Sequence, residues 1–500
     1  MASTQQHWLK RIIDSATVGA LTRRVASQTR TVVEGSWGSS TTLLAGALAQ
    51  RAGRCVLLVV AHLDDADDAI DDLDLFELAG RPLSTARFGA LEVLPGETNV
   101  SLDLLAERLA LAGRLVSPDG VIAEAEALPD VIVAPIQALM QSIPEPGVLD
   151  RFQITLRTGG SHPPARLMTW LTDAGYRRVD AIEQPGDFAA RGGIIDIFPP
   201  AGTGDEAGDG PVRLDYFGDE IDTICRVDPD TLGSGDRLEQ VRIIGASSEH
   251  IQSDEHTTSL LSLLPDECVI VMHEVLELSE QARGYYERLT DPRGIYSPQA
   301  VFKALTERPH VEVNQYTSTT PADQPVTAPV RALMAFDHES PRAIAELAAV
   351  ARGADTTAVV LCQRDGERDR LIELLHEHAP ESIDALTLEV AYLHRGFVWQ
   401  EDDGPAVVLV PHQELFHRYT TRRRLRRVAG GAGTRAADAF VELTVGDYVV
   451  HVEHGVARFT GLKTMKRKDV AEEYLTLEFA DRALLHVPAT QIELVQKYIG

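Results

Sequence analysis

Residues 35–42 of the chain, GSWGSSTT, have the types and spacing of a loop that cradles phosphate groups. In the nucleotide-binding pattern G-x-x-x-x-G-K-[ST], the lysine reaches the β- and γ-phosphates and the hydroxyl binds the metal ion. Counted from Gly35, however, Ser40 replaces the second glycine, Thr41 replaces the lysine, and only the hydroxyl of Thr42 is retained. Backbone N–H groups at a helix N-terminus can bind phosphate without the lysine, so the loop alone leaves nucleotide binding open.

Hydrolysis of a nucleotide would also need an acidic residue at the end of a strand to hold the metal ion. The candidate strand is VIVMHEV at 269–275, where His273 stands in the place of the aspartate and Glu274 remains. Both halves of an ATPase site are thus degraded, which favours a structural α/β domain that binds no nucleotide and has no catalytic residue. The residues of this degenerate nucleotide loop are Gly35, Gly38, Ser40, Thr41, Thr42, His273 and Glu274.

A second candidate site is the strand-like run VRLDYF at 212–217. Side chains alternate between the two faces of a strand, so Arg213 and Phe217 share one face, whereas Val212 and Leu214 share the other. If the second face packs against the amphipathic helix predicted at 164–174, Phe217 points to solvent beside Arg213. An exposed Phe next to an Arg is typical of a protein-binding hot spot.

Arg191, at the start of the neighbouring strand run, would extend this candidate face. In the alternative interpretation, Phe217 fills a small second core and the arginines pair with nearby acidic residues. Spacing alone favours the alternative.

Bulk composition limits the kinds of function that the chain can have. Its 500 residues predict about three or four domains, and 44% hydrophobic residues are enough to build cores. A formal net charge of -28 makes a general nucleic-acid clamp a poor prediction, because an acidic surface repels phosphate, and it favours protein partners. Four scattered cysteines predict neither disulfides nor a zinc site. No apolar run is long enough for a membrane span or a signal peptide, so we expect a cytoplasmic protein.

The patterns along the chain predict an α/β multidomain protein. Apolar strands at 56–60 and 131–134 alternate with helices at 41–52, 63–79 and 103–116, which is typical of a parallel sheet. The predicted units are a first α/β domain at 1–150, which resumes at 247–313, an inserted α+β domain at 151–246, a linker at 314–329, a small α/β domain at 330–421, a basic and then Gly/Ala-rich linker at 422–439, and a small β-barrel at 440–500.

Two further clusters have weaker functional interpretations. His451, Glu453 and His454 lack an evident further ligand, so we predict no metal site. The run RRRLRR at 422–427 would suit nucleic acid, although such runs more often are solvated or pair with a protein's own acidic surface.

Two long stretches carry a resemblance to a known family. The run DAGYRRVDAIEQPGDFAARGGIIDIFPP, followed by PVRLDYFGDEIDTICRVDPDT, resembles the inserted domain of bacterial transcription-repair coupling factors and is similar to part of the excision nuclease subunit UvrB. The run GDYVVHVEHGVARFTGL, followed by EEYLTLEFADRALLHVP, resembles their RNA polymerase-interacting domain, a Tudor-like barrel shared with the CarD regulators. The stretch HRGFVWQEDDGPAVVLVPHQELF resembles the segment before that barrel.

This resemblance implies roles that spacing does not. It implies that the first domain has the fold of a helicase lobe without ATPase function, which agrees with Ser40, Thr41 and His273. It implies that Arg191, Arg213 and Phe217 bind UvrA, which reverses the preference stated above. It also implies that the barrel binds the β subunit of RNA polymerase through the stretch GLKTM. The residues in that stretch are Leu462 and Met465, the latter at a position where a leucine is more familiar.

The family resemblance also implies that ATP, Mg²⁺ and DNA bind to a C-terminal motor, a DNA translocase that nothing before Gly500 resembles. The chain then resembles an N-terminal fragment that needs no cofactor of its own and acts as an adaptor. Two other hypotheses remain: a divergent UvrB-like ATPase or helicase, which the missing lysine and aspartate disfavour, and a CarD-like regulator that acts only through its barrel.

Overall fold

The computed structural model of the chain describes most of its residues. The described ranges are 7–91, 102–116, 128–149, 152–200, 210–228, 233–245, 256–316, 325–353, 355–402, 404–417, 448–451, 455–467, 470–479, 484–488 and 495–497. The arginine run at 422–427, the linker predicted at 422–439, and Glu453 and His454 lie outside these ranges.

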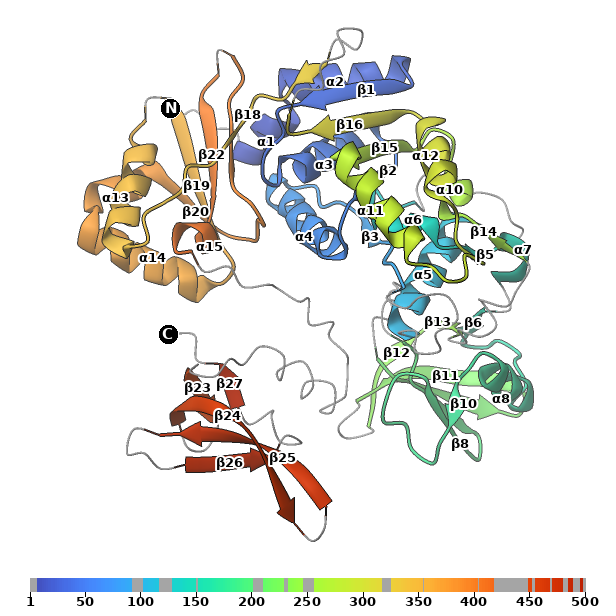
Figure 1. Ribbon diagram of the computed structural model, residues 1–500. Coiled ribbons are helices and arrows are strands. Elements are labelled where there is room, and N and C mark those ends of the chain that lie inside the picture. The colour runs from blue at the N-terminus through green and yellow to red at the C-terminus, as the bar shows by residue number, and fades with distance from the viewer. Residues whose placement is uncertain are drawn as a thin grey trace.

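The first domain is built on a sheet of seven parallel strands in the order β17-β1-β16-β15-β2-β4-β3 (Figure 1). The bounds of these strands are β1 (Arg30–Glu34), β2 (Val56–Val60), β3 (Thr85–Arg87), β4 (Val131–Pro135), β15 (Val269–His273), β16 (His310–Asn314) and β17 (Val326–Thr327). The central strands β2 and β4 are apolar along their whole length because both faces are covered, so alternate residues such as Leu57 and Leu58 enter opposite cores.

Helices cover both faces of this sheet. The bounds are α1 (Trp8–Ile13), α2 (Ala16–Ser27), α3 (Ser40–Ala52), α4 (Leu63–Leu73), α5 (Leu102–Leu115), α6 (Ile136–Met140), α7 (Pro146–Leu149), α10 (Leu260–Leu263), α11 (Val275–Glu287) and α12 (Pro298–Thr306). The predicted helices at 41–52 and 103–116 and the strands at 56–60 and 131–134 are confirmed. The helix predicted at 63–79 is α only to Leu73 and continues as the 3-10 helix η1 (Asp74–Ala79). Residues 326–327, inside the predicted linker, form the edge strand β17.

The inserted domain is an antiparallel sheet with one helix against its inner face. The sheet order is β12-β11-β10-β9-β8-β7, with only β7 and β8 parallel to each other. The bounds are β7 (Arg177–Arg178), β8 (Asp187–Arg191), β9 (Ile194–Ile197), β10 (Val212–Phe217), β11 (Glu220–Val227), β12 (Ser234–Leu238) and α8 (Pro164–Asp173). Leu167 and Leu171 of α8 share a core with Val212 and Leu214, as the alternation predicts.

Both ends of the inserted domain lie side by side. Strand β6 (Gln153–Arg157) enters the domain and pairs in antiparallel fashion with β13 (Gln240–Ile244), which leaves it. Close to this junction, the short strands β5 (Ile143–Pro144) and β14 (Thr257–Thr258) pair in the same way. This arrangement explains how the chain leaves the first domain near 150 and returns to it near 256.

The third domain has a five-stranded sheet in the order β18-β21-β22-β19-β20. The bounds are β18 (Val330–Ala332), β19 (Thr356–Cys362), β20 (Leu386–Val390), β21 (Phe397–Trp399), β22 (Ala406–Pro411), α13 (Ser340–Ala351), α14 (Asp365–His378), η3 (Pro380–Ala385) and α15 (His412–Leu415). One sheet face packs on these helices. The other face joins the core of the first domain, where Val359, Phe397 and Leu409 cluster with Trp8 and Leu9 (Figure 1). The two domains therefore share one hydrophobic core.

The C-terminal part is a five-stranded antiparallel sheet in the order β26-β25-β24-β23-β27. The bounds are β23 (Tyr448–His451), β24 (Gly455–Arg467), β25 (Val470–Glu478), β26 (Leu484–Pro488) and β27 (Val495–Lys497). Its core includes Phe459, Leu475 and Leu477. In the described residues β26 and β27 stand at opposite edges, so the closed Tudor-like barrel stays a prediction.

Three further observations concern membrane-spanning helices, metal sites and cysteines. Among the described residues, no helix combines the length and apolar character required to cross a membrane. The same residues contain no cluster of three or more His, Cys, Asp or Glu side chains placed to hold a metal ion. All four cysteines are buried and free.

Candidate interaction face and degenerate nucleotide loop

Phe217 is the most exposed large hydrophobic side chain among the described residues, with 85% of its surface accessible. It ends β10 at a hairpin whose turn residue, Gly218, has φ +67. The turn ends the strand pairing, so no neighbouring strand covers the ring. The alternative in which Phe217 fills a second core is therefore wrong.

Arg213, by contrast, pairs with an acidic residue, as the alternative interpretation predicts. Its Nε and Nη2 donate to the two carboxylate oxygens of Asp196 on β9, at 2.6 and 2.9 Å. The hydrogen bond to Asp196 raises the pKa of Arg213. A bidentate pair of this kind fixes the plane of the guanidinium group. The outer face thus presents a positioned cation together with a bare aromatic ring.

Arg191 belongs to the same outer face of the sheet. It ends β8 and lies opposite Ile194 of β9, which in turn lies opposite Asp215 of β10. Residues that lie opposite each other share a face, so this row is continuous with the row that contains Arg213. The guanidinium group of Arg191 donates to the carbonyl of Asp180.

Ile194 is a member of this face that the sequence analysis missed. Its side chain is 38% exposed. Its neighbour Ile195 is 2% exposed and belongs to the inner core. Side chains alternate between the two faces along the run GIIDIF, so the sequence could have placed Ile194 on the outer face, opposite the core residue Ile195.

The degenerate nucleotide loop is closed from within by its own hydroxyl groups. Ser36 Oγ lies 2.7 Å from both Ser40 Oγ and Thr41 Oγ1, and the N–H of Trp37 donates to Ser40 Oγ at 3.1 Å. Ser36, Ser40 and Thr41 are all at most 3% exposed. The residue in the lysine position thus points into the loop, and Thr42, at 8% exposed, is also buried.

His273 is the last residue of β15, and Glu274 follows it as the N-cap residue of α11. Within the described part of the chain, neither belongs to a cluster of three or more side chains that could hold a metal ion. Glu274 has φ +55, and its carboxylate accepts the N–H of Gln315 at 2.6 Å. Burial raises the pKa of Glu274 and lowers the pKa of His273, which favours the neutral form of each side chain.

A segment of the third domain, Tyr392–Gly396, lies against the same loop, and sequence analysis did not predict this contact. We call it the docking segment. The N–H of Ser39 donates to the carbonyl of Arg395 at 3.1 Å, and the N–H of Arg395 donates to Ser39 Oγ at 2.9 Å. Ser39 and Arg395 are far apart in the sequence, and neither the loop pattern around Ser39 nor the stretch that begins at His394 indicates that the two segments meet, so the sequence carried no signal for the contact.

Leu462 and Met465 lie on β24, where they are opposite Leu475 and Glu472 of β25. The structure describes their backbone but not their side chains. Their assignment as contacts for RNA polymerase therefore stays a prediction.

Together, the fold and these sites define a class: a multidomain α/β protein with an inserted antiparallel domain that exposes an aromatic and basic face, and with a loop before α3 whose hydroxyl groups bond to one another. Comparisons with known proteins identify two of its parts. The UvrB interaction domain matches residues 154–248, and the CarD-like/TRCF RID domain matches residues 443–499.

Curated relatives extend the match across almost the whole chain. The transcription-repair-coupling factor of Bacillus subtilis is 24% identical over 94% of this chain and 45% of its own length. That of Escherichia coli is 24% identical over 93% of this chain and 44% of its own length. The predicted resemblance to transcription-repair-coupling factors is thus confirmed, and the chain spans less than half the length of these relatives.

Proposed function

We propose that the chain is an adaptor that links stalled RNA polymerase to UvrA in transcription-coupled nucleotide excision repair. One observation carries the proposal: Phe217 is exposed on the same face of β10 as Arg213, whose geometry is fixed by Asp196, on the domain that matches the UvrB interaction family. An exposed aromatic ring and an ordered guanidinium group lose little conformational entropy on binding, as is typical of hot spots. This process takes place in the bacterial cytoplasm, where the proposal places the chain.

Binding to UvrA tests the proposal directly. The purified chain, immobilised at neutral pH, should retain UvrA and release it when free chain is added. Failure to retain UvrA at micromolar concentration would reject this half of the adaptor.

The ion pair between Arg213 and Asp196, on the same face as Phe217, gives the proposal a finer test. Asp196→Asn removes the charge that orients Arg213 while leaving Phe217 in place, so we expect UvrA affinity to fall about fivefold, or roughly 1 kcal/mol. Isothermal titration calorimetry of the variant and the wild type would measure the change. As a matched control, Asp222→Asn removes a carboxylate from β11 of the same domain, at an exposed position, and should leave the affinity unchanged. Equal affinities for both variants and the wild type would mean that Arg213 does not contribute.

The other half of the adaptor is the C-terminal sheet, which we propose binds the β subunit of RNA polymerase. Met465→Asp introduces a charge into the predicted apolar contact at β24 and should weaken capture of RNA polymerase at least tenfold, or about 1.4 kcal/mol. Its retention of UvrA through the inserted domain should be normal, which shows that only the RNA polymerase half of the adaptor is affected. Unchanged capture of RNA polymerase would remove Met465 from the interface.

The ATPase hypothesis has less support than the adaptor. Thr41 is buried in the lysine position, and the hydroxyl groups of the loop bond to one another. We propose that ATP, Mg²⁺ and DNA are handled by sequence that lies outside the match to this chain. The CarD-like hypothesis would leave the outer face of the inserted domain without a role.

A further inference from the structure

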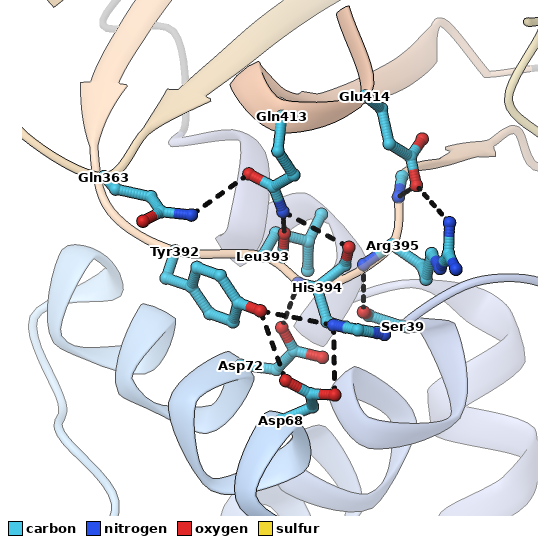
Figure 2. A network of polar contacts seen from close by, with 11 residues as sticks. Ser39, Asp68, Asp72, Gln363, Tyr392, Leu393, His394, Arg395, Gln413 and Glu414 are labelled. Carbon is cyan, nitrogen blue, oxygen red and sulfur yellow. Dashed lines mark hydrogen bonds and ion pairs between the residues drawn. The ribbon is translucent and has the colours of Figure 1, made fainter. Parts of the chain in front are cut away.

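The docking segment lies against the start of α3, at the end of the degenerate nucleotide loop, and Figure 2 shows Arg395 of the segment beside Ser39. In such loops, backbone N–H groups at the start of the helix point to the phosphate oxygens. Here the helix is α3, and the N–H of Ser39 just before it donates to the carbonyl of Arg395 at 3.1 Å. A peptide carbonyl thus accepts a hydrogen bond that the loop would otherwise offer to a nucleotide.

Gly38 allows this close approach between the domains. A Cβ atom on Gly38, which has φ +55, would lie 2.5 Å from the carbonyl oxygen of Gly396 and 2.9 Å from that of Arg395. Gly38 therefore has no room for a side chain, and the two backbones pack directly against each other at this point. Gly396 is needed for packing inside the third domain, because a Cβ atom there would lie 2.5 Å from Leu333 Cδ2 and 2.6 Å from the carbonyl oxygen of Leu409.

The docking segment has dedicated partners on both sides. Three successive N–H groups of the segment donate hydrogen bonds, two of them across the domain boundary. The pairs are His394 N–H to Asp72 Oδ1 at 2.6 Å, Arg395 N–H to Ser39 Oγ at 2.9 Å, and Gly396 N–H to Glu414 Oε1 at 3.2 Å. Because each of these backbone N–H groups has a hydrogen-bond acceptor, the contact between the segment and its surroundings is a specific interface.

The third domain also forms hydrogen bonds with the docking segment through the side chain of Gln413. Gln413 Nε2 donates to the carbonyls of Leu393 and His394, at 2.7 and 3.3 Å. Gln413 is only 8% exposed, and its own side-chain oxygen lies 3.4 Å from Gln363 Nε2. The segment is therefore preorganised by its own domain before it contacts the first domain.

We propose that the docking segment is a built-in occupant of the degenerate nucleotide loop, which excludes nucleotide and locks the third domain onto the first. Loss of the lysine alone would leave an open loop that binds phosphate weakly through its N–H groups. An occupied loop instead excludes nucleotide whether or not the lysine is present. The contact thereby turns the former ligand site into a joint between two domains of one chain.

Amide hydrogen exchange on the full chain, followed by mass spectrometry, tests this proposal. In the wild type, the amides of residues 394–396 should be protected, and millimolar Mg-ATP should leave exchange at 35–42 unchanged. Gly38→Ala places a methyl group against the docking segment and should accelerate exchange at 394–396 by at least about tenfold. Gly53→Ala is the matched control, because Gly53 has φ +61 at the other end of α3 and a Cβ atom there has no neighbour within 4 Å.

Every result of the exchange experiment either supports or overturns the proposed role of the docking segment. Faster exchange at 394–396 in Gly38→Ala but not in Gly53→Ala supports the proposal. Equal exchange in both variants overturns it, as does protection of residues 35–42 by Mg-ATP in the wild type. If Gly38→Ala does not fold, Ser39→Ala gives the same decision, because it removes the acceptor of the Arg395 N–H, together with the hydrogen bond from Ser39 to Asp72, and should accelerate exchange at that amide.

Discussion

Phe217→Ala should weaken binding of the chain to UvrA by about 2 kcal/mol or more, which is a roughly thirtyfold rise in Kd. The ring is 85% exposed in the free chain, so its removal costs little folding free energy. On binding, the same ring would lose its contact with water, and apolar burial stabilises by about 25 cal/mol per Å². The effect should therefore appear in affinity and not in stability.

Calorimetric titration of UvrA into the wild type and the variant would measure this change, with thermal unfolding as a check on the fold. Leu276→Ala is the matched control, because Leu276 is 73% exposed but belongs to α11 of the first domain. It should bind UvrA with wild-type affinity. If Phe217→Ala also bound with wild-type affinity, the outer face of the inserted domain would not be the UvrA site.

The outer face shows how far local sequence patterns can predict a site. Alternation placed Phe217 and Arg213 together and placed Leu214 in the core, because the period of a strand is two residues. Alternation could not decide whether Phe217 was covered, since that depends on what packs against the outer side. The resemblance to a known family favoured exposure, and the structure agrees.

The nucleotide loop shows what local patterns cannot predict. The replacement of the lysine by Thr41 was visible in the sequence, but the bond from Thr41 to Ser36 and the docking of Arg395 were not. Gly38 is needed because two backbones meet there, and a contact between residues so distant in sequence leaves no periodic signal. The linker predicted at 314–329 failed in part for the same reason: β17 is a short edge strand whose pairing depends on β1.

The joint between the domains should also weaken as pH rises through about 7. Burial raises the pKa of Asp72 from 3.8 to about 7, although hydrogen bonds from Ser39 and from the N–H of His394 oppose the shift. Burial opposes the charge of His394, but the hydrogen bond and the charge of Asp68, 3.1 Å away, outweigh it and raise the pKa of His394. The hydroxyl of Tyr392 lies 3.2 Å from both Asp68 Oδ1 and His394 Nδ1 and completes the cluster (Figure 2).

The raised pKa values of Asp72 and His394 both make the folded chain less stable as pH rises. An aspartate whose pKa is raised in the folded state keeps a proton that the unfolded chain releases, so stability falls as pH rises from 3.8 to about 7. The stability that His394 contributes is complete below its unfolded pKa of 6.5 and is lost as pH rises through its higher folded pKa. At 1.36 kcal/mol for each pKa unit, Asp72 alone would lower the free energy of unfolding by about 2 kcal/mol between about pH 5 and pH 7, because half of the folded molecules still hold the proton at pH 7.

Asp72→Asn should remove this dependence. Asparagine keeps an oxygen that can accept the His394 N–H but carries no charge to bury, so we expect the variant to match the wild type near pH 5 and to exceed it by about 3 kcal/mol near pH 8. Urea unfolding of both chains across this range would measure the difference. Asp64→Asn, which removes an exposed carboxylate from the first turn of the same helix, should run parallel to the wild type at every pH. Parallel curves for Asp72→Asn and the wild type would show that Asp72 does not titrate at the joint, and that the docking segment is held equally well with a charged carboxylate beneath it.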